Sequence, residues 1–543
     1  MPLRRLLPFP SPALASLVLL ALLTAAAIAG YEGRRVAQVV LLVLPALLWL
    51  QWPLRAGRWR IARGLLVSVT VALFLIDGAA RAFMRTQYQA APDSSLVLAA
   101  VANTTLREAL EYASSQAVAL ALAAVALIVA LLLAFALVVA ANRQSRPLPP
   151  RARWAVALLL LLCLASLLSK PWRRHHPLLF WPHWVASVES LRLSWADQHA
   201  QRDRLLANAR AAGARSLTTL PSTVVLVLTD SVNRDNMSLY GYARDTTPQL
   251  AALARAEGGR LLTLRHAWSV QPGTLASLSG LFSFGTRDED DPAGSTQHIL
   301  ALARAAGYRV WWMSNHDDVA IEQQHARLAD TFEMINREPG RSTASLDGEL
   351  LDCLEEALVD PAPRKLIVVH LLGAHPHYRL RAPADFDPLP DRADAVDDAM
   401  QRRGQPAWLI AARRDYDTAI SYHDAVVAQT LRLSRQHTPP GGEAAWMFVS
   451  DHGQEVGHEK AHAGHSPTTA AGYRVPALVW RSTAPFEPDL VGRPFRVDWA
   501  GWTLASLMAL DWQGRTGDRD VLGSGYAWSA PQLGGVRVVR YDQ

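Results

Sequence analysis

A carboxylate and an imidazole stand side by side in the segment Ser450-Asp-His-Gly453, directly after a run of apolar residues. Both side chains are good zinc ligands where the backbone turns sharply at a following glycine. Asp230, which follows another apolar run, supplies a second carboxylate. Taken alone, such an aspartate is more often a helix N-cap, and Asp-His-Gly is an ordinary turn. Because suitable ligands recur, the sequence predicts a metal site formed by Asp230, Asp451 and His452.

Thr274 is the candidate nucleophile beside that metal. It follows the turn-forming pair Pro272-Gly273 and precedes an apolar helical run over residues 275–282. The N-terminus of a helix favours anionic oxygen and a developing alkoxide. The alternative is that the Thr274 hydroxyl only caps this helix. Ser277 and Ser279 are competing hydroxyls in the same stretch.

Short runs typical of buried strands must position these residues. They alternate with longer helical patterns, which predicts an α/β domain with a mostly parallel sheet and helices on both faces. The predicted strands are 224–228, 309–313, 365–369, 445–449 and 477–480, and the predicted helices are 247–257, 296–306, 346–358 and 416–435. Ligands of such sheets bind just past the carboxyl ends of the strands. The first four strands are followed there by Asp230, Asn315, His370 with His375, and Asp451 with His452.

The segment from Asp230 to Pro248 resembles the opening signature of the membrane phosphoethanolamine transferases, a sulfatase-like branch of the alkaline phosphatase superfamily. Further segments resemble that family in the same order along the chain: Thr274 with Ser277 and Phe282-Ser283, Trp312-Met-Ser-Asn315, His370-Leu-Leu-Gly-Ala-His375, Ser450-Asp-His-Gly453, Gly464-His465 and Val475-Pro476. The resemblance covers nearly the whole chain. Position 230 departs from the family, which usually has glutamate there, and is closer to the general superfamily pattern.

The resemblance implies one tight zinc ion held by four side chains, namely Asp230, Thr274, Asp451 and His452. It also implies that Asn315, His375 and His465 bind the substrate, with the two histidines around the transferred phosphoryl group or a second, weaker metal. His458 and His462 lie in the same histidine-rich segment, where solvated loop positions are the alternative. Thr274 would then form a covalent phospho-threonine intermediate.

The activity implied by the resemblance is transfer of phosphoethanolamine from a phospholipid donor, phosphatidylethanolamine, to an envelope acceptor. The acceptor stays open among lipid A, the lipopolysaccharide core, a periplasmic glucan and a surface protein. A glycerol-phosphate transferase or another hydrolase or transferase of the sulfatase superfamily is the alternative. The Cys/Ser-x-Pro-x-Arg run of classical sulfatases does not stand at Thr274. A non-catalytic membrane scaffold is disfavoured because all four predicted ligand positions hold competent residues.

The N-terminal third is dominated by Leu, Ala and Val and predicts a bundle of five transmembrane helices. The apolar segments are 12–30, 36–52, 64–84, 115–141 and 154–169, with Trp49, Trp52, Trp154 and Trp172 as interfacial anchors. Arginines before the first, after the second and after the fourth segment place those loops in the cytoplasm. Arg34 and Arg35 do not fit this pattern, because they lie in the first loop, which is predicted to be outside. The inner arginines are Arg4, Arg5, Arg55, Arg58, Arg60, Arg63, Arg143, Arg146, Arg151 and Arg153. An odd number of crossings from an inner N-terminus puts the rest of the chain outside the cytoplasm.

We therefore expect a transmembrane domain over 1–169, an interfacial helical connector over 170–217 and an extracytoplasmic, periplasmic catalytic domain over 218–543, in the bacterial inner membrane. The net charge of +6 is explained at least partly by topology and does not indicate nucleic-acid binding. Cys163 lies in an apolar segment and Cys353 in the later half, so we expect no disulfide between them.

Overall fold

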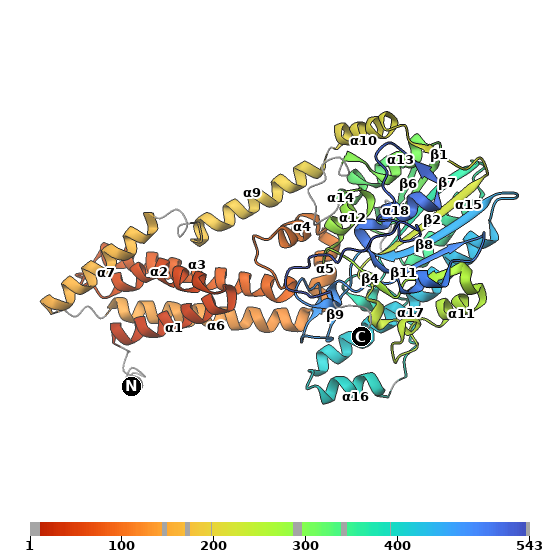
Figure 1. The fold of residues 1–543 in the computed structure, drawn as a ribbon. Helices are drawn as coiled ribbons and strands as arrows, with labels where there is room; N and C mark the ends of the chain where they lie inside the picture. Colours follow the sequence, from red (N-terminus) through yellow and green to blue (C-terminus); the bar gives the residue numbers. More distant parts are fainter. Residues whose placement is uncertain are drawn as a thin grey trace. The chain divides into compact units, whose positions relative to one another are not determined.

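The computed structural model describes residues 11–143, 149–168, 174–196, 198–285, 296–337, 345–390 and 392–538 (Figure 1). The chain divides into two units, Met1–Ala102 with Leu106–Leu191, and Asn103–Thr105 with Arg192–Gln543. The predicted boundary at 169–170 and the residues Arg4, Arg5, Arg146 and Trp172 lie outside the described residues. The first unit is helical and the second contains all the described strands.

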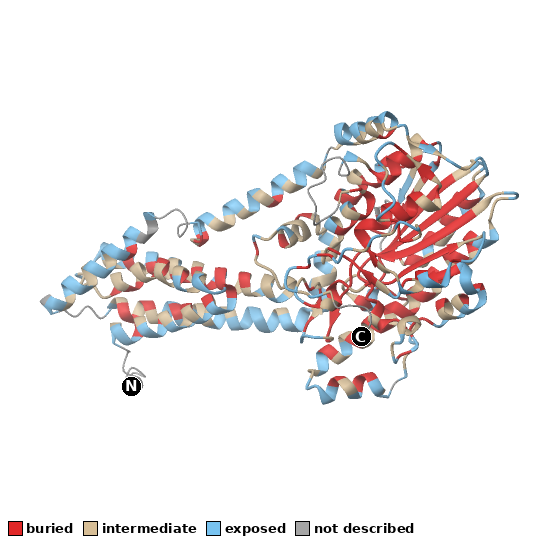
Figure 2. Cartoon of the chain, viewed as in Figure 1, coloured by how far each residue is buried: buried red, intermediate tan, exposed pale blue. Residues whose placement is uncertain are grey.

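Long apolar helices form the first unit. They are α1 (Pro12–Gly30), α2 (Arg34–Leu50), α3 (Arg58–Tyr88), α4 (Ser95–Asn103), α5 (Leu106–Ser115), α6 (Ala117–Arg143), α7 (Pro150–Leu168) and most of α9 (Pro177–Ala196). Their facing sides share a core that includes Leu19, Val43, Val71 and Val138, whereas many outward apolar side chains are exposed (Figure 2). Such exposure suits helices solvated by lipid.

Each of the five predicted transmembrane segments coincides with one of these helices, α1, α2, α3, α6 and α7. Among the described helices, α1, α3 and α6 are long and apolar enough to cross a membrane by length and composition. The α2 helix has 17 residues and contains Pro45. The structure thus confirms apolar N-terminal helices, and the count of five crossings stays a prediction.

A seven-stranded sheet organises the second unit in the order β3-β11-β8-β2-β7-β5-β6. Its strands are β2 (Ser222–Thr229), β3 (Leu261–Thr263), β5 (Arg309–Ser314), β6 (Thr331–Met334), β7 (Arg364–Leu371), β8 (Glu443–Ser450) and β11 (Ala477–Arg481). All five predicted strands are confirmed as members of this one sheet. The pairings from β8 across to β6 are parallel, and β11 is antiparallel to both of its neighbours. The sheet is therefore mixed, with a parallel centre.

Helices cover both faces of the sheet because its central strands are apolar on both sides. Val224, Leu226 and Leu228 of β2 join a core with α12 (Thr274–Phe282), α13 (Ile299–Ala305) and α18 (Ala500–Leu507). Val225 and Val227 join the opposite core with α11 (Pro248–Glu257), α15 (Leu350–Val359) and α17 (Ala407–Gln436). The predicted helices at 247–257, 296–306, 346–358 and 416–435 are confirmed as α11, α13, α15 and α17. Their ends agree with the prediction to within four residues, except that α17 begins at Ala407.

Smaller elements complete the second unit. Short strand pairs are β1 (Arg215–Ser216) with β13 (Leu510–Asp511), β9 (Glu455–Val456) with β10 (Ala463–Gly464), and β4 (His266–Trp268) with β12 (Pro494–Arg496). The remaining α-helices are α10 (His199–Ala211), α14 (Val319–Gln324) and α16 (Ala395–Arg402). Within the predicted connector, the described part is thus helical over α9 and α10.

Candidate metal centre

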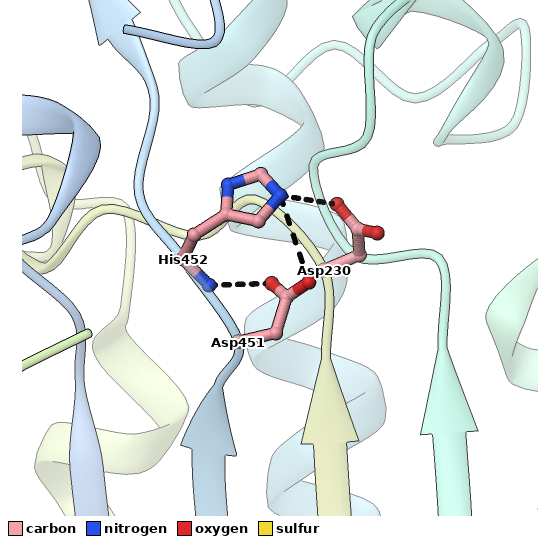
Figure 3. Close-up of side chains that lie close together, drawn as sticks. All are labelled: Asp230, Asp451 and His452. Atoms are coloured by element: carbon pink, nitrogen blue, oxygen red, sulfur yellow. Dashed lines mark hydrogen bonds and ion pairs between the residues drawn. The ribbon is translucent and has the colours of Figure 1, made fainter. Parts of the chain in front are cut away.

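Strand register brings the predicted ligands together. β2 and β8 run parallel as neighbours, and Thr229 pairs with Ser450 at their carboxyl ends. The next residues along each strand are Asp230 and Asp451, so the two carboxylates emerge side by side. His452 follows Asp451, and the three side chains lie close together (Figure 3). All three are fully buried. One ligand atom of each lies within 4.8 Å of the others, a spacing that suits a single metal ion.

The His452 imidazole is aimed at both carboxylates. Its Nε2 atom lies 3.7 Å from Asp230 Oδ1 and 3.5 Å from Asp451 Oδ2. Nδ1 lies 2.9 Å from the Gly453 carbonyl oxygen, which assigns the proton to Nδ1 and leaves Nε2 as the free ligand atom. Gly453 is required here, because a Cβ atom at this position would lie 2.2 Å from the Ala471 carbonyl oxygen.

The Thr274 hydroxyl completes the cluster. It donates a hydrogen bond to Asp230 Oδ2 at 2.8 Å and lies 3.4 Å from His452 Nε2. Thr274 is the first residue of α12, and Gly273 occupies the N-cap position without a side-chain cap. The competing hydroxyls are engaged elsewhere, since Ser277 donates to the Asp451 carbonyl and Ser279 to the Leu275 carbonyl. The hydroxyl of Thr274 therefore faces the carboxylates and does not cap the helix.

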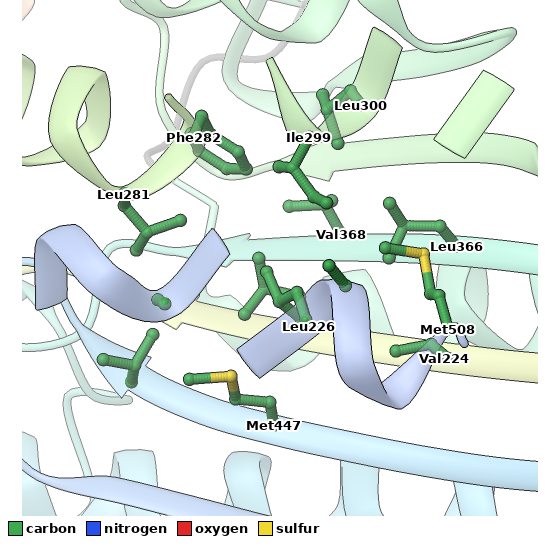
Figure 4. Packing of buried hydrophobic residues seen from close by; sticks show 14 of the residues in the cluster. Val224, Leu226, Leu281, Phe282, Ile299, Leu300, Leu366, Val368, Met447 and Met508 are labelled. Carbon is green, nitrogen blue, oxygen red and sulfur yellow. The ribbon is translucent and has the colours of Figure 1, made fainter. Parts of the chain in front are cut away.

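Apolar packing holds α12 in place behind this hydroxyl. Leu281 and Phe282 are fully buried, and they pack in the same cluster as Leu226 and Val368 of the central strands (Figure 4). Because the helix is seated on the sheet by these contacts, its N-terminus is fixed at the carboxyl edge of β2. The first residue of a core-anchored helix is a rigid place for a nucleophile.

The charges in this cluster are unbalanced. Burial and the neighbouring charge of Asp230 raise the pKa of Asp451 to about 7. Burial also opposes ionisation of Asp230, but His375, His452 and His316 hold its pKa below the usual range. Among the described residues Asp451 Oδ2 has no hydrogen-bond partner although it is buried. A buried carboxylate oxygen without a donor is costly unless a cation fills the space, so the residues fit a metal.

The sequence did not single out the residues that brace Asp230. Ser231 has a left-handed backbone (φ 65°) and its hydroxyl donates to Asp230 Oδ1. The same hydroxyl accepts a hydrogen bond from Gln454 Nε2 at 2.8 Å, and the Ser231 amide donates to Asp451 Oδ1 at 3.1 Å. A buried serine next to a predicted ligand was the available signal, but the positive φ is visible only in the fold.

His375 and His465, which are predicted to bind the substrate, lie near the cluster. The His465 ring is 4.7 Å from that of His452, and its Nδ1 has no partner in the described part of the chain. His375 directly follows Ala374, whose amide donates to the Asp230 carbonyl oxygen at 3.0 Å, and its ring lies 6.2 Å from that of His316. Burial lowers the pKa of His375 to about 4, so that its imidazole is neutral at neutral pH. Both roles stay predictions.

Other predicted residues are engaged away from the ligands. Asn315 donates to Asp347 and accepts from Asn336 and Ser345. His370 pairs with Ser314, His458 with Asn236, and His462 with the His465 carbonyl oxygen. Their side chains hold neighbouring segments, and the substrate role of Asn315 stays a prediction.

His316 is a second residue that the sequence did not reveal. Its Nδ1 lies 3.2 Å from Asp318 Oδ2 and its Nε2 lies 3.2 Å from the Leu371 carbonyl oxygen. Burial opposes the charged form, but the Asp318 hydrogen bond and the Asp230 charge raise the pKa of His316 to about 9. The ring stacks on His370 with centroids 4.0 Å apart. A buried imidazolium thus lies near Asp230, and its position directly after Asn315 at the end of β5 was the available signal.

Comparison with known proteins shows what this part of the chain is similar to. Residues 222–487 match the Sulfatase family model. Over 270 residues the chain is 30% identical to phosphoethanolamine transferase EptC of Escherichia coli (strain K12), a match that covers 48% of this chain and 45% of the relative. Over 319 residues it is 24% identical to Kdo(2)-lipid A phosphoethanolamine 7''-transferase of the same organism, covering 55% and 52%. The matches thus span about half the length of these relatives.

Two solved structures are similar to this chain in fold. The C-terminal periplasmic domain of EptC from Escherichia coli, in complex with zinc, has 28% identity and a TM-score of 0.53, covering 58% of this chain and 90% of that one. The integral membrane protein lipooligosaccharide phosphoethanolamine transferase A of Neisseria meningitidis has 17% identity and a TM-score of 0.59 over 94% of this chain and 96% of that one. The second likeness concerns the fold alone, and it extends over the helical unit as well.

Proposed function

Residues 222–487 are a sulfatase-family domain related to the phosphoethanolamine transferases, and from this premise we propose that the chain transfers phosphoethanolamine from a phospholipid to an envelope acceptor. The donor is phosphatidylethanolamine, and the acceptor is a glycolipid or glycan such as lipid A or the lipopolysaccharide core. The related proteins carry this transfer in their names. The observation that carries the proposal is the Thr274 hydroxyl, 2.8 Å from Asp230 within a buried cluster of zinc-type ligands.

Zinc bound by Asp230, Thr274, Asp451 and His452 would lower the pKa of the threonine hydroxyl and offset the charge of the two carboxylates. The chain's own residues prepare that hydroxyl in three ways. Asp230 accepts its hydrogen bond, α12 holds it at a helix N-terminus, and the neighbouring Asp230, Asp451 and His452 are fully buried. A relative of similar fold was solved in complex with zinc, which supports zinc as the metal. We propose one tight site and a possible second, weaker one.

The reaction proceeds as two displacements at phosphorus. The Thr274 oxygen forms a bond to the phosphorus of the donor, the bond to the glycerol oxygen breaks, and diacylglycerol leaves with a proton. An acceptor hydroxyl or phosphate oxygen then gives up its proton and bonds to phosphorus, the phospho-threonine bond breaks, and the Thr274 oxygen takes up a proton to restore its hydroxyl. The neutral imidazoles of His375 and His465 lie beside the cluster, where they can orient the phosphoryl oxygens.

Attachment to the membrane serves this chemistry. A lipid donor and a lipid-linked acceptor are both confined to the bilayer, so an enzyme carried on membrane helices meets them at a high effective concentration. We place the catalytic unit in the periplasm and the helices in the inner membrane. A reporter fused after Gln543 is expected to be active only outside the cytoplasm, and activity inside would contradict this orientation.

The test is a transfer assay on the purified full chain in lipid vesicles. Phosphatidylethanolamine and phosphatidylglycerol, each labelled in the headgroup, are supplied in parallel with lipid A. Label from the ethanolamine lipid is expected in the glycolipid, with the added mass of phosphoethanolamine. Transfer from the glycerol lipid alone would instead identify a glycerol-phosphate transferase. Release of free headgroup without transfer would identify a hydrolase.

A further inference from the structure

The loop that carries His375 is fastened to the end of β2. The Ala374 amide donates to the Asp230 carbonyl oxygen at 3.0 Å, and the His375 amide donates to the Leu372 carbonyl oxygen at 3.0 Å. Gly373 has a left-handed backbone (φ +56°), and a Cβ atom there would lie 2.1 Å from the Thr229 hydroxyl. The backbone between Leu371 and His375 is therefore in direct contact with the end of β2 that precedes Asp230.

Asp347 binds the backbone of the same loop. Its Oδ1 accepts the Leu372 amide at 2.8 Å, and its Oδ2 accepts the Gly373 amide at 2.8 Å. One buried carboxylate thus takes up two successive backbone N–H groups. This arrangement needs both oxygens of a carboxylate, since an amide side chain has a single acceptor oxygen.

Buried polar partners fix Asp347 in turn. Asn315 Nδ2 donates to Asp347 Oδ1 at 2.9 Å, and His423 Nδ1 of α17 lies 3.6 Å from Oδ2. The Asn315 carbonyl oxygen accepts from Asn336 and Ser345, so its orientation is determined. Asp347 itself is 3% exposed, at the start of the turn that leads into α15. Its position is therefore set by β5, α17 and the segment before α15.

None of the hydrogen bonds that the structure gives Asp347, within the described residues, reaches Asp230, Thr274, Asp451 or His452. Its influence on the cluster must pass through the loop. His375 is the side chain at the end of that loop. It directly follows Ala374, whose amide donates to the Asp230 carbonyl oxygen, and its ring lies 6.2 Å from that of His316. The contacts thus form a chain from Asn315 through Asp347 and the loop backbone to His375.

We infer that Asp347 is a positioning residue that sets the His375 imidazole against the reacting phosphoryl group. The role assigned to His375 rests on the proposed function, whereas the geometric link from Asp347 to the loop does not. Asn315, which the family resemblance assigns to substrate, acts in this arrangement as the support of Asp347. Outer groups that orient the ligands of a metal site typically cost about 10- to 100-fold in affinity or activity when they are changed, and we expect an effect of that size here.

A double-mutant cycle on the full chain in vesicles tests the link. Asp347→Asn is expected to lower kcat about 10- to 100-fold with KM for the donor lipid nearly unchanged. In a His375→Ala background the same change should cost less than about twofold, because the side chain it positions is gone. Asp347→Glu keeps both oxygens and should recover part of the rate. Asp352→Asn, on the exposed side of α15, is the matched control and should leave kcat unchanged.

A second measurement separates this inference from the proposed function, because it needs no substrate. Diethyl pyrocarbonate modifies neutral imidazoles, and the rate at His375 is followed by mass spectrometry of its peptide. Asp347→Asn and Asp347→Glu should each change that rate several-fold, with zinc content and melting temperature close to wild type. Asp352→Asn should not change it.

The outcomes divide cleanly. Equal losses of kcat from Asp347→Asn with and without His375, or an unchanged modification rate at His375, would overturn the inference even if transfer is observed. If Asp347→Asn does not fold, Asp347→Glu carries the same two measurements. If Asp347→Asn changes the modification rate at His375 but the wild-type protein transfers no phosphoethanolamine, the positioning link is supported and the proposed function is refuted.

Discussion

Two buried carboxylate sites, one in each unit, differ in how their oxygens are satisfied. In the helical unit Asp77 of α3 is 1% exposed, and every hydrogen bond it needs comes from the protein. Tyr31 donates to its Oδ2 at 2.6 Å, and Arg81 and Trp181 donate to its Oδ1 at 2.8 and 2.9 Å. In the sheet unit Asp230 and Asp451 lie together, and within the described residues neither has an arginine or lysine partner and Asp451 Oδ2 has no donor.

The difference separates a structural ion pair from a ligand site. A buried charge is tolerated when cations and donors of the protein surround it, as at Asp77. Asp230 and Asp451, when both are ionised, stay short of positive charge even with the His316 imidazolium nearby. A proton on Asp451 or a bound cation would offset that charge, and the ligand types favour the cation. A buried carboxylate whose hydrogen bonds and charge are met by the protein, as at Asp77, stabilises the fold. Buried carboxylates that lack donors and positive charge, as at Asp230 and Asp451, indicate a site that binds a metal ion.

The largest expected effect tests whether the deficient site is also the reactive one. Thr274→Ala should abolish transfer, by at least about three orders of magnitude, since no second hydroxyl in α12 faces Asp230. Thr274→Ser should keep partial activity because it retains the hydroxyl. Intact-mass analysis of wild type with donor lipid and no acceptor should show a phosphoethanolamine adduct on the Thr274 peptide. Ser279→Ala is the control, and an active Thr274→Ala protein would refute the assignment.

The next effect concerns the metal. Asp451→Asn or His452→Ala should remove zinc from the purified protein, because each takes away a ligand from a site with few others. Asp77→Asn, which changes the satisfied carboxylate, should leave the zinc content as it was. Metal analysis by mass spectrometry measures all three. If the sheet-unit variants kept their zinc, or the Asp77 variant lost it, the distinction between the two sites would be wrong.

A change at Asp77, whose hydrogen bonds are all met by the protein, should lower the stability of the fold. Asp77→Asn leaves the Arg81 guanidinium buried without its counter-charge, which is expected to lower the free energy of unfolding by about 3–5 kcal/mol. Asp93→Asn is the matched control, because Asp93 is about half exposed and lies 4.0 Å from Arg35 in a surface pair. That change should cost less than about 1 kcal/mol. Thermal unfolding in a mild detergent compares the variants, and equal melting temperatures would contradict the structural role of Asp77.

The smallest effect is a pH dependence at the deficient site. The pKa of Asp451 is raised to about 7 in the metal-free protein, so below that pH the ion must displace a proton in order to bind. The apparent zinc affinity should therefore fall by about tenfold per pH unit below pH 7 and level off above it. Competition with a zinc-sensitive dye between pH 5.5 and 8 measures this. An apparent zinc affinity that rose as the pH fell would contradict this prediction.

The same carboxyl group should affect the stability of the metal-free protein. Its folded-state pKa lies above the unfolded value of 3.8, so its contribution to stability is fully present below the unfolded pKa and is lost as the pH rises through about 7. Zinc should cancel this loss, since the ion takes the place of the proton. A metal-free protein that is no less stable at pH 8 than at pH 5 would argue against the raised pKa.

The strands and the strand-end residues were predictable because both are local properties of the chain. Runs such as Val224–Leu228 and Ala445–Val449 are apolar and β-branched or aromatic, which is sufficient to predict buried strands of an α/β sheet. Asp230, Thr274, Asp451 and His452 were singled out from their types and neighbours, and the structure brings the four together. The family resemblance is confirmed by the matches to the Sulfatase model and to the phosphoethanolamine transferases.

The remaining features depend on which elements become neighbours in space. Parallel pairing of β2 with β8 sets Asp230 beside Asp451, and nothing in either segment specifies that pairing. Asp347 lies 25 residues before Leu372 and yet binds its amide, and Asp77 meets Trp181 across 104 residues. The sequence by itself determined which residues could ligate, attack or span a membrane, because side-chain chemistry and periodicity are carried by the residues themselves. The tertiary structure alone decided which carboxylates are satisfied and which are left short of charge, because that balance depends on donors brought in from distant parts of the chain.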